Sequence, residues 1–234
     1  MDNDISFETC LFLSSHKLAI SVYEKQSLNK VYYKETFIDQ SLDFIEHQFL
    51  NSFLNENIFE IEKNLKDFVE HVYLIIDSNE FLTINVSIKK NNYGEIITMG
   101  KLTHILNEAK NICKKTIDER KIVHMLIDNY LIDKERYSYL PENLVCDFFS
   151  LDIRFICLSN SFIKNVEKIL KRYQVSIIDI LHLNYVESLL KQNEDDLFKK
   201  SIKIAKGYNK NEVFIVPKQQ TNKGFFELFF NFFN

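Results

Sequence analysis

Residues 10–36 read CLFLSSHKLAISVYEKQSLNKVYYKET, and their pattern gives the strongest indication of the fold. Three runs rich in apolar and β-branched residues are separated by two short polar breaks, and the runs cover residues 10–13, 18–23 and 31–36. Runs of this kind predict strands, and short breaks between them predict antiparallel hairpins. The chain is therefore expected to begin with a three-stranded antiparallel meander.

Alternating helix and strand patterns follow the meander. Ser41 can cap a helix whose apolar residues from Leu42 to Leu54 recur at three- and four-residue spacing, so this helix should lie against the meander. The run at 71–77 is continuously apolar between polar ends, which is typical of a strand covered on both faces. A helix pattern at 160–170 and a second apolar run at 175–181 continue this order. The outer parts of the sequence thus predict an α/β core.

The middle of the sequence has a different pattern. Apolar and polar residues alternate strictly at 83–89, which predicts a strand with one face in water. After a break at Gly100, a helical stripe runs from Leu102 to Cys113, and two more strand patterns follow at 121–132 and 147–158. We expect a strand-helix-strand-strand subdomain, residues 81–158, inserted into a core formed by two segments, residues 1–80 and 159–217.

Composition excludes several classes of function. The 234 residues include 29 basic and 33 acidic side chains, a formal net charge of −4, which disfavours sequence-independent nucleic-acid binding. The cysteines lack zinc-ligand or redox spacing and are expected to be reduced and buried; they are Cys10, Cys113, Cys146 and Cys157. No nucleophile motif is present, the six histidines do not pair, and the acids at 194–196 favour a helix cap over a metal site. We expect no enzymatic activity, no cofactor and no metal.

The end of the sequence predicts a membrane anchor. Residues 1–8 carry three acids and no basic residue, unlike a signal peptide, so the chain should stay in the cytoplasm. A polar linker is expected at 218–223. If residues 224–234 form a helix, their polar side chains line up in one stripe, and seven large apolar side chains occupy the rest of its surface: Phe225, Phe226, Leu228, Phe229, Phe230, Phe232 and Phe233. Eleven residues reach about 16 Å, half of a bilayer's ~30 Å, so this helix should lie in the interface. A terminal core helix is the alternative.

The helix before this tail has a basic face as well. Lys199, Lys200, Lys203 and Lys206 recur on one side of it, which predicts either a solvated face or a contact with anionic lipid.

The order of elements and several local strings resemble the bacterial cell-division protein FtsA, an actin-like family. The most specific match is RKIVHMLIDNYLID at 120–133, which is similar to a strand of that family. The strand pattern at 72–76 looks like the one leading into the family's inserted subdomain, and residues 155–181 look like the return from it. The resemblance covers residues 8–192 and implies half of an actin-like, ribonuclease H-like core with an inserted strand-helix-strand-strand subdomain and a C-terminal amphipathic helix.

The sequence departs from that family where nucleotide binds. The family's first phosphate turn places Asp and Gly where this chain has Phe12 and Ser14, and only about 44 residues follow Leu190, where a second phosphate turn should begin. ATP binding and hydrolysis are therefore not expected, although a diverged ATPase is an alternative. The subdomain that takes the C-terminal peptide of FtsZ has no counterpart, so FtsZ binding is not carried over.

The resemblance implies a peripheral membrane adaptor at the cytoplasmic face of the bacterial inner membrane. Such an adaptor would tether divisome components in cell division, bind membrane lipids through the tail and self-associate through the inserted subdomain. The alternative is a cytoplasmic assembly scaffold of a pilus or secretion system, because pilus-assembly relatives share the inserted subdomain. Such a scaffold would bind a short peptide of a membrane partner.

Overall fold

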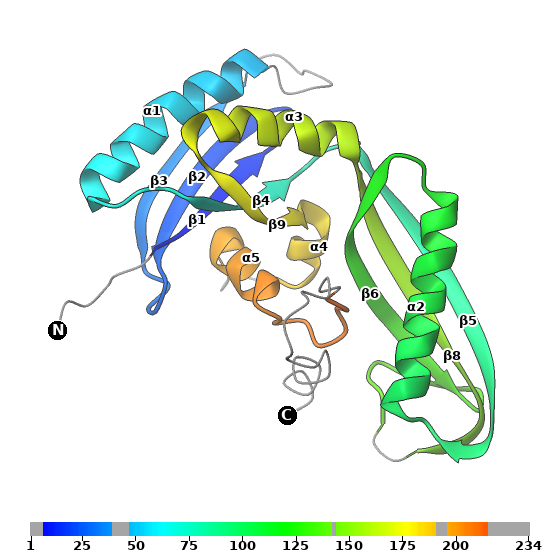
Figure 1. Cartoon of the computed structure of the whole chain (residues 1–234). Coiled ribbons are helices and arrows are strands. Elements are labelled where there is room, and N and C mark those ends of the chain that lie inside the picture. Colours follow the sequence, from blue (N-terminus) through cyan, green and yellow to red (C-terminus); the bar gives the residue numbers. More distant parts are fainter. Residues whose placement is uncertain (1–6, 39–46, 142–143, 191–195, 215–234) are drawn as a thin grey trace, which may run out of the picture. The chain divides into compact units, whose positions relative to one another are not determined.

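The computed structural model describes residues 7–38, 47–141, 144–190 and 196–214 (Figure 1). Its contacts divide the chain into two compact units, each made of two segments. Unit 1 consists of Met1–Phe81 and Asn160–Tyr208, and unit 2 consists of Leu82–Ser159 and Asn209–Asn234. The seven apolar tail residues, and the predicted cap Ser41, lie outside the described residues.

Unit 1 is built on a five-stranded sheet. Its strands are β1 (Phe7–Leu13), β2 (Lys17–Glu24), β3 (Lys30–Phe37), β4 (His71–Ile76) and β9 (Ser176–His182). The order across the sheet is β3-β2-β1-β4-β9; β2 is antiparallel to both β1 and β3, and β4 is parallel to both β1 and β9. The predicted meander is confirmed, and this mixed arrangement is that of half an actin-like, ribonuclease H-like core.

Helices cover both faces of this sheet (Figure 1). They are α1 (His47–Leu65), α3 (Asn160–Leu170) with the short 3₁₀ turn Lys171–Tyr173, α4 (Leu183–Ser188) and α5 (Leu197–Ala205). Tyr32 of β3 donates its hydroxyl proton to Asn57 of α1 (2.8 Å), as expected for a helix packed on the meander. Its neighbour Tyr33 points to the other face and meets Phe198 of α5 edge-on. Burial on both faces makes β1 and β4 the centre of the core.

Unit 2 is a four-stranded sheet with one helix. The elements are β5 (Phe81–Ile96), α2 (Met99–Thr116), β6 (Arg120–Ile132), β7 (Glu135–Tyr137) and β8 (Val145–Ser159), and the sheet order is β5-β8-β6-β7. The apolar stripe of α2 packs on one face together with large side chains such as Phe149 and Phe155. The other face carries polar pairs, including Ser87 with Asp152 (2.7 Å) and Arg154 with Asp128 (2.8 Å). One wet face agrees with the alternation in the sequence.

The structure corrects the prediction at the end of the core. Among the described residues, 209–214 belong to unit 2, whereas the sequence pattern assigned them to the core. The amide of Val213 donates to the carbonyl of Met125 (2.8 Å), and the amide of Ile127 donates to the carbonyl of Asn211 (2.9 Å). A short apolar run indicates a strand, but it does not indicate which sheet edge the strand joins. The short strand β7 was not predicted.

Candidate protein-interaction surface

The turn between β1 and β2, which the resemblance of the sequence matches to the phosphate turn of actin-like ATPases, is closed on itself. Ser14 Oγ accepts hydrogen bonds from the backbone amides of His16 (3.3 Å) and Lys17 (2.9 Å) and donates to the Lys17 carbonyl (3.1 Å). A phosphate turn needs such amides directed at the ligand. Phe12, at the position of the family's Asp, is an apolar core residue. This geometry supports the expectation of a chain without nucleotide, which stays a prediction.

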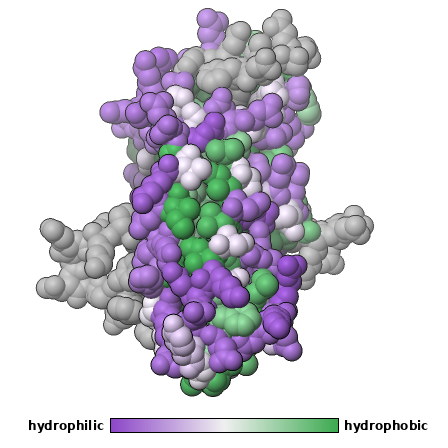
Figure 2. All heavy atoms as spheres, turned by 90° about the vertical axis from the view of Figure 1, so that its right-hand side faces the viewer, coloured by the Kyte–Doolittle hydropathy of each residue, from purple (hydrophilic) through white to green (hydrophobic). Residues whose placement is uncertain are grey.

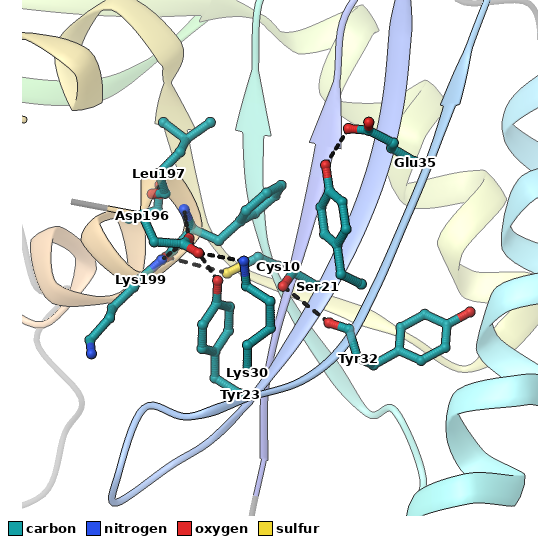
Figure 3. A network of polar contacts seen from close by, with 12 residues as sticks. Cys10, Ser21, Tyr23, Lys30, Tyr32, Glu35, Asp196, Leu197 and Lys199 are labelled. Carbon is teal, nitrogen blue, oxygen red and sulfur yellow. Dashed lines mark hydrogen bonds and ion pairs between the residues drawn. The ribbon is translucent and has the colours of Figure 1, made fainter. Parts of the chain in front are cut away.

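Asp196, the last of the three acids at 194–196, caps the N-terminus of α5, as the sequence predicted; the other two acids lie outside the described residues. Asp196 Oδ1 accepts from the amides of Phe198 (3.0 Å) and Lys199 (3.2 Å) and from the Tyr23 hydroxyl (2.7 Å), and Oδ2 pairs with Lys30 Nζ (2.5 Å) (Figure 3). Burial works to raise the pKa of Asp196, but hydrogen bonds led by Lys30 and Tyr23 outweigh it and hold that pKa below its usual value. The carboxylate joins α5 to the β2–β3 hairpin.

The predicted basic face of α5 is divided in the structure. Lys200 is buried, and its ammonium lies 3.9 Å from the centroid of the Tyr208 ring. Lys206 Nζ donates to the buried carboxylate of Glu8 (2.6 Å). Two of the four lysines thus make contacts within unit 1. The basic face available to water or to anionic lipid is therefore smaller than the sequence predicted.

Other candidate residues are structural as well. His124 is buried, and its Nδ1 lies 2.7 Å from Glu212 Oε1. All four cysteines are free and buried, as predicted, and burial raises the pKa of the Cys157 thiol to about 12. In the part of the chain that the structure describes, no three His, Cys, Asp or Glu side chains form a group that could hold a metal ion. Across those same residues, no helix is both long and apolar enough to span a bilayer.

The surface best suited to a partner lies on unit 2, where α2 meets β5. Two ion pairs connect α2 with the second half of β5: Lys90 with Glu108 (2.7 Å) and Lys101 with Glu95 (2.5 Å). Lys101 Nζ also donates to Asn92 Oδ1 (2.6 Å). These contacts fix the helix over this end of the strand.

Beyond the ion pairs the contact becomes apolar and open to solvent. Ile112 lies one turn after Glu108 on the same flank of α2 and is 43% exposed. Ile84 and Val86 of β5 are partly buried against the unit 2 core, and Ile88 is buried within it. Figure 2 shows an apolar stripe on this side, flanked by polar residues. We call Ile84, Val86, Ile88 and Ile112 the α2/β5 stripe.

Two further properties distinguish this stripe from the partly exposed rim that surrounds any hydrophobic core. β5 is the outer strand of its sheet, and among the described residues no strand pairs with its second edge. Residues 81–116 contain six lysines and two glutamates, a net charge of +4, whereas the whole chain carries −4. An unpaired edge beside apolar side chains and positive charge can bind an extended segment that is apolar and acidic.

Sequence reasoning found the residues of this stripe but not their exposure. Alternation correctly placed Ile84, Val86 and Ile88 on the inner face of a half-wet strand. The partial exposure of Ile84 and Val86 follows from the position of β5 at the sheet edge, which depends on strand order and not on local pattern.

Comparison with known proteins gives no family, since no family model and no curated protein matches the sequence. Solved structures with a similar fold include a PilM–PilN type IV pilus biogenesis complex, with 8% identity, a TM-score of 0.49, and coverage of 76% of this chain and 48% of that one. The cytoplasmic domain of EpsL, an inner membrane component of the type II secretion system of Vibrio cholerae, is 11% identical with a TM-score of 0.38, covering 81% and 60%.

A third similar structure is a protein of unknown function with an actin-like ATPase fold from Bacteroides thetaiotaomicron. It is 14% identical with a TM-score of 0.37, covering 80% of this chain and 58% of that one. This chain therefore spans between 48% and 60% of the length of these three chains. At such identities the likeness concerns the fold alone.

Proposed function

We propose that this chain is a non-enzymatic assembly scaffold of a pilus or secretion system, and that it binds a short extended peptide of a membrane partner at the α2/β5 stripe. The observation that carries this proposal is an apolar, partly exposed stripe beside the unpaired edge of β5, within a layer of net charge +4. A peptide strand added to β5 would bury both its own backbone and the exposed parts of Ile84, Val86 and Ile112.

The expected affinity is modest. Covering a partly exposed apolar side chain contributes about 0.5–1 kcal/mol, and each main-chain hydrogen bond adds about 0.5–1.5 kcal/mol net. Three side chains and four hydrogen bonds give about 4–9 kcal/mol before the cost of ordering the peptide, which corresponds to dissociation constants from micromolar upward. Lysines around the stripe favour acidic side chains on the partner. Such weak, edge-directed binding suits a component that acts in a larger assembly.

Two of the similar solved structures belong to a type IV pilus complex and to a type II secretion system. We propose an assembly of the same class for this chain. The second candidate is an FtsA-like membrane adaptor in cell division, which the resemblance of the sequence favours. Both candidates place the chain at the cytoplasmic face of the inner membrane. In both, residues 224–234 bind lipid.

A pair of neighbouring substitutions on β5 tests the peptide site. Val86 faces the stripe and Asn85 faces the wet side of the sheet, so Val86→Asp and Asn85→Asp introduce the same charge on opposite faces. The probe is a fluorescein-labelled ten-residue peptide that alternates Val with Asp or Glu, and its binding to the full chain is followed by anisotropy. We expect Val86→Asp to weaken binding at least tenfold and Asn85→Asp to change it less than threefold. Equal binding by both variants would refute the site.

The choice between the two assemblies needs a second experiment. The wild-type chain and the same two variants serve as baits in a bacterial lysate, and the captured proteins are quantified by mass spectrometry. Pilus or secretion proteins that are retained by Asn85→Asp and lost with Val86→Asp would support the proposal. Division proteins with that behaviour would support the FtsA-like candidate instead.

A further inference from the structure

The α2/β5 stripe has a second possible occupant within the same chain. We infer that residues 224–234 bind the α2/β5 stripe of their own chain, and that lipid and the partner peptide compete with this contact. The inference concerns regulation of the site described under the proposed function and shares its surface. It does not depend on which partner binds there.

The chemistry of the segment matches the stripe. Residues 224–234 contain seven large apolar side chains, one acid, Glu227, and no base. The stripe offers partly exposed apolar surface at Ile84, Val86 and Ile112. Residues 81–116 carry a net charge of +4, or +3 without Lys89, which lies over the Phe148 ring on the opposite face of β5. Burial of phenyl rings on this surface and attraction of Glu227 to the lysines both favour contact.

The last residues that the structure describes lie within reach of the stripe. Val213 is hydrogen-bonded to the edge of β6 that faces away from β8, so β6 and β8 both stand between it and β5. Three strand spacings amount to about 14 Å, and the helix layer adds about another 10 Å. Residues 214–223 can extend to roughly 33 Å, which exceeds the path from the β6 edge to the stripe.

Covalent attachment makes even a weak contact effective. A short connection holds the segment at a local concentration in the millimolar range, so an intrinsic dissociation constant of about 1 mM leaves the stripe half occupied. The same phenyl rings cannot be buried on the stripe and in lipid at once. A partner peptide that takes the stripe therefore releases the tail for the membrane, and a membrane that takes the tail opens the stripe, with equal coupling in both directions.

Disulfide trapping in the full chain tests this contact. Phe229→Cys is combined with Val86→Cys, on the stripe, or with Asn85→Cys, on the opposite face of β5, and oxidised glutathione is added. The four native cysteines are buried, which limits their interference. Peptide mapping should show the 86–229 bridge forming at least tenfold faster than the 85–229 bridge. Its rate should not change with protein concentration, and vesicles with one third anionic lipid should suppress it.

Equal rates for the two pairs, or a rate proportional to protein concentration, would overturn the inference; the latter result would assign the stripe to a second copy. Amide hydrogen exchange needs no cysteine and covers the case of a poorly folding variant. Removing residues 224–234 should speed exchange of residues 84–88 at least fivefold, and unchanged exchange would overturn the contact. If trapping succeeds while the alternating peptide fails to bind, the proposed function falls and this inference stands. If the alternating peptide binds while trapping fails, only this inference falls.

Discussion

A single carboxylate, Asp196, connects three parts of unit 1. It caps the first turn of α5, accepts the Tyr23 hydroxyl proton and pairs with Lys30, so one side chain satisfies two orphan amides and two side-chain donors. Burial raises the pKa of Tyr23, and its hydrogen bond to Asp196 adds to this effect, so this phenol stays protonated and donates.

Replacing Asp196 should remove a pH-dependent part of the stability. Its folded pKa lies below the unfolded value of about 3.9, so the stabilisation is complete above that value and is lost as the pH falls through the folded pKa. Asp196→Asn should lower the free energy of unfolding by about 1–3 kcal/mol at pH 7 and by much less at pH 3. Urea unfolding at pH 7, 5 and 3 measures this, with the exposed Asp118→Asn as the control. A difference independent of pH would contradict the assignment.

Ser14 has a comparable role in the β1–β2 turn. Because its hydroxyl accepts from two backbone amides, Ser14→Ala should destabilise the protein by about 1 kcal/mol. The adjacent Ser15→Ala is the matched control and should change the free energy of unfolding by less than 0.5 kcal/mol. Chemical denaturation of the two variants side by side gives the comparison. Equal effects would show that the turn does not depend on this hydroxyl.

At the scale of elements, the segment that follows α5 completes the β6 edge. Glu212 bridges to Leu126 in the strand pattern, and its carboxylate is paired with the buried His124. Breaking a buried pair leaves one polar partner without compensation.

Glu212→Ala should therefore lower the free energy of unfolding by about 2–4 kcal/mol, and Glu212→Gln by less because the amide can still accept a hydrogen bond. Hydrogen exchange of residues 123–127, measured alongside denaturation, locates the effect in β6. The nearby exposed Lys210→Ala serves as the control. Loss of stability without faster exchange in β6 would place the role of Glu212 elsewhere.

The local sequence pattern predicted most elements, because residues 10–36 show runs typical of strands and residues 102–113 show the three- and four-residue spacing of a helix. It also predicted Asp196 as a cap, because acids before an apolar helix have one common use. Pairing between distant segments was beyond it. Nothing in the residues around Glu212 indicates β6 as their neighbour, and nothing local to Ile84 or Val86 indicates an outer strand. The candidate site depends on strand order, so only the structure could reveal it.

For the whole molecule, the tail remains the predicted membrane contact. If each of its seven apolar side chains recovers a third to a half of full burial, about 1.5–3 kcal/mol, the gross gain is about 4–10 kcal/mol before ordering costs. Deletion of residues 224–234 should abolish co-sedimentation with anionic liposomes, and Phe229→Asp should weaken it at least fivefold. Glu227→Gln, which removes a charge that opposes anionic lipid, should not weaken it. Unchanged pelleting of the deletion variant would exclude the anchor.

The insertion of unit 2 also has a consequence for the order of folding. The parallel pair β4–β9 joins His71 to Ser176, and between these strands the chain makes the 78-residue excursion Leu82–Ser159. Closing a flexible loop of that length costs on the order of 4 kcal/mol in chain entropy. The strands that enter and leave the insert, β5 and β8, are hydrogen-bonded neighbours. Once the insert has folded, its own sheet holds its two ends. The entropy cost of pairing β4 with β9 is then close to that of closing a short loop, so we expect the insert to fold first.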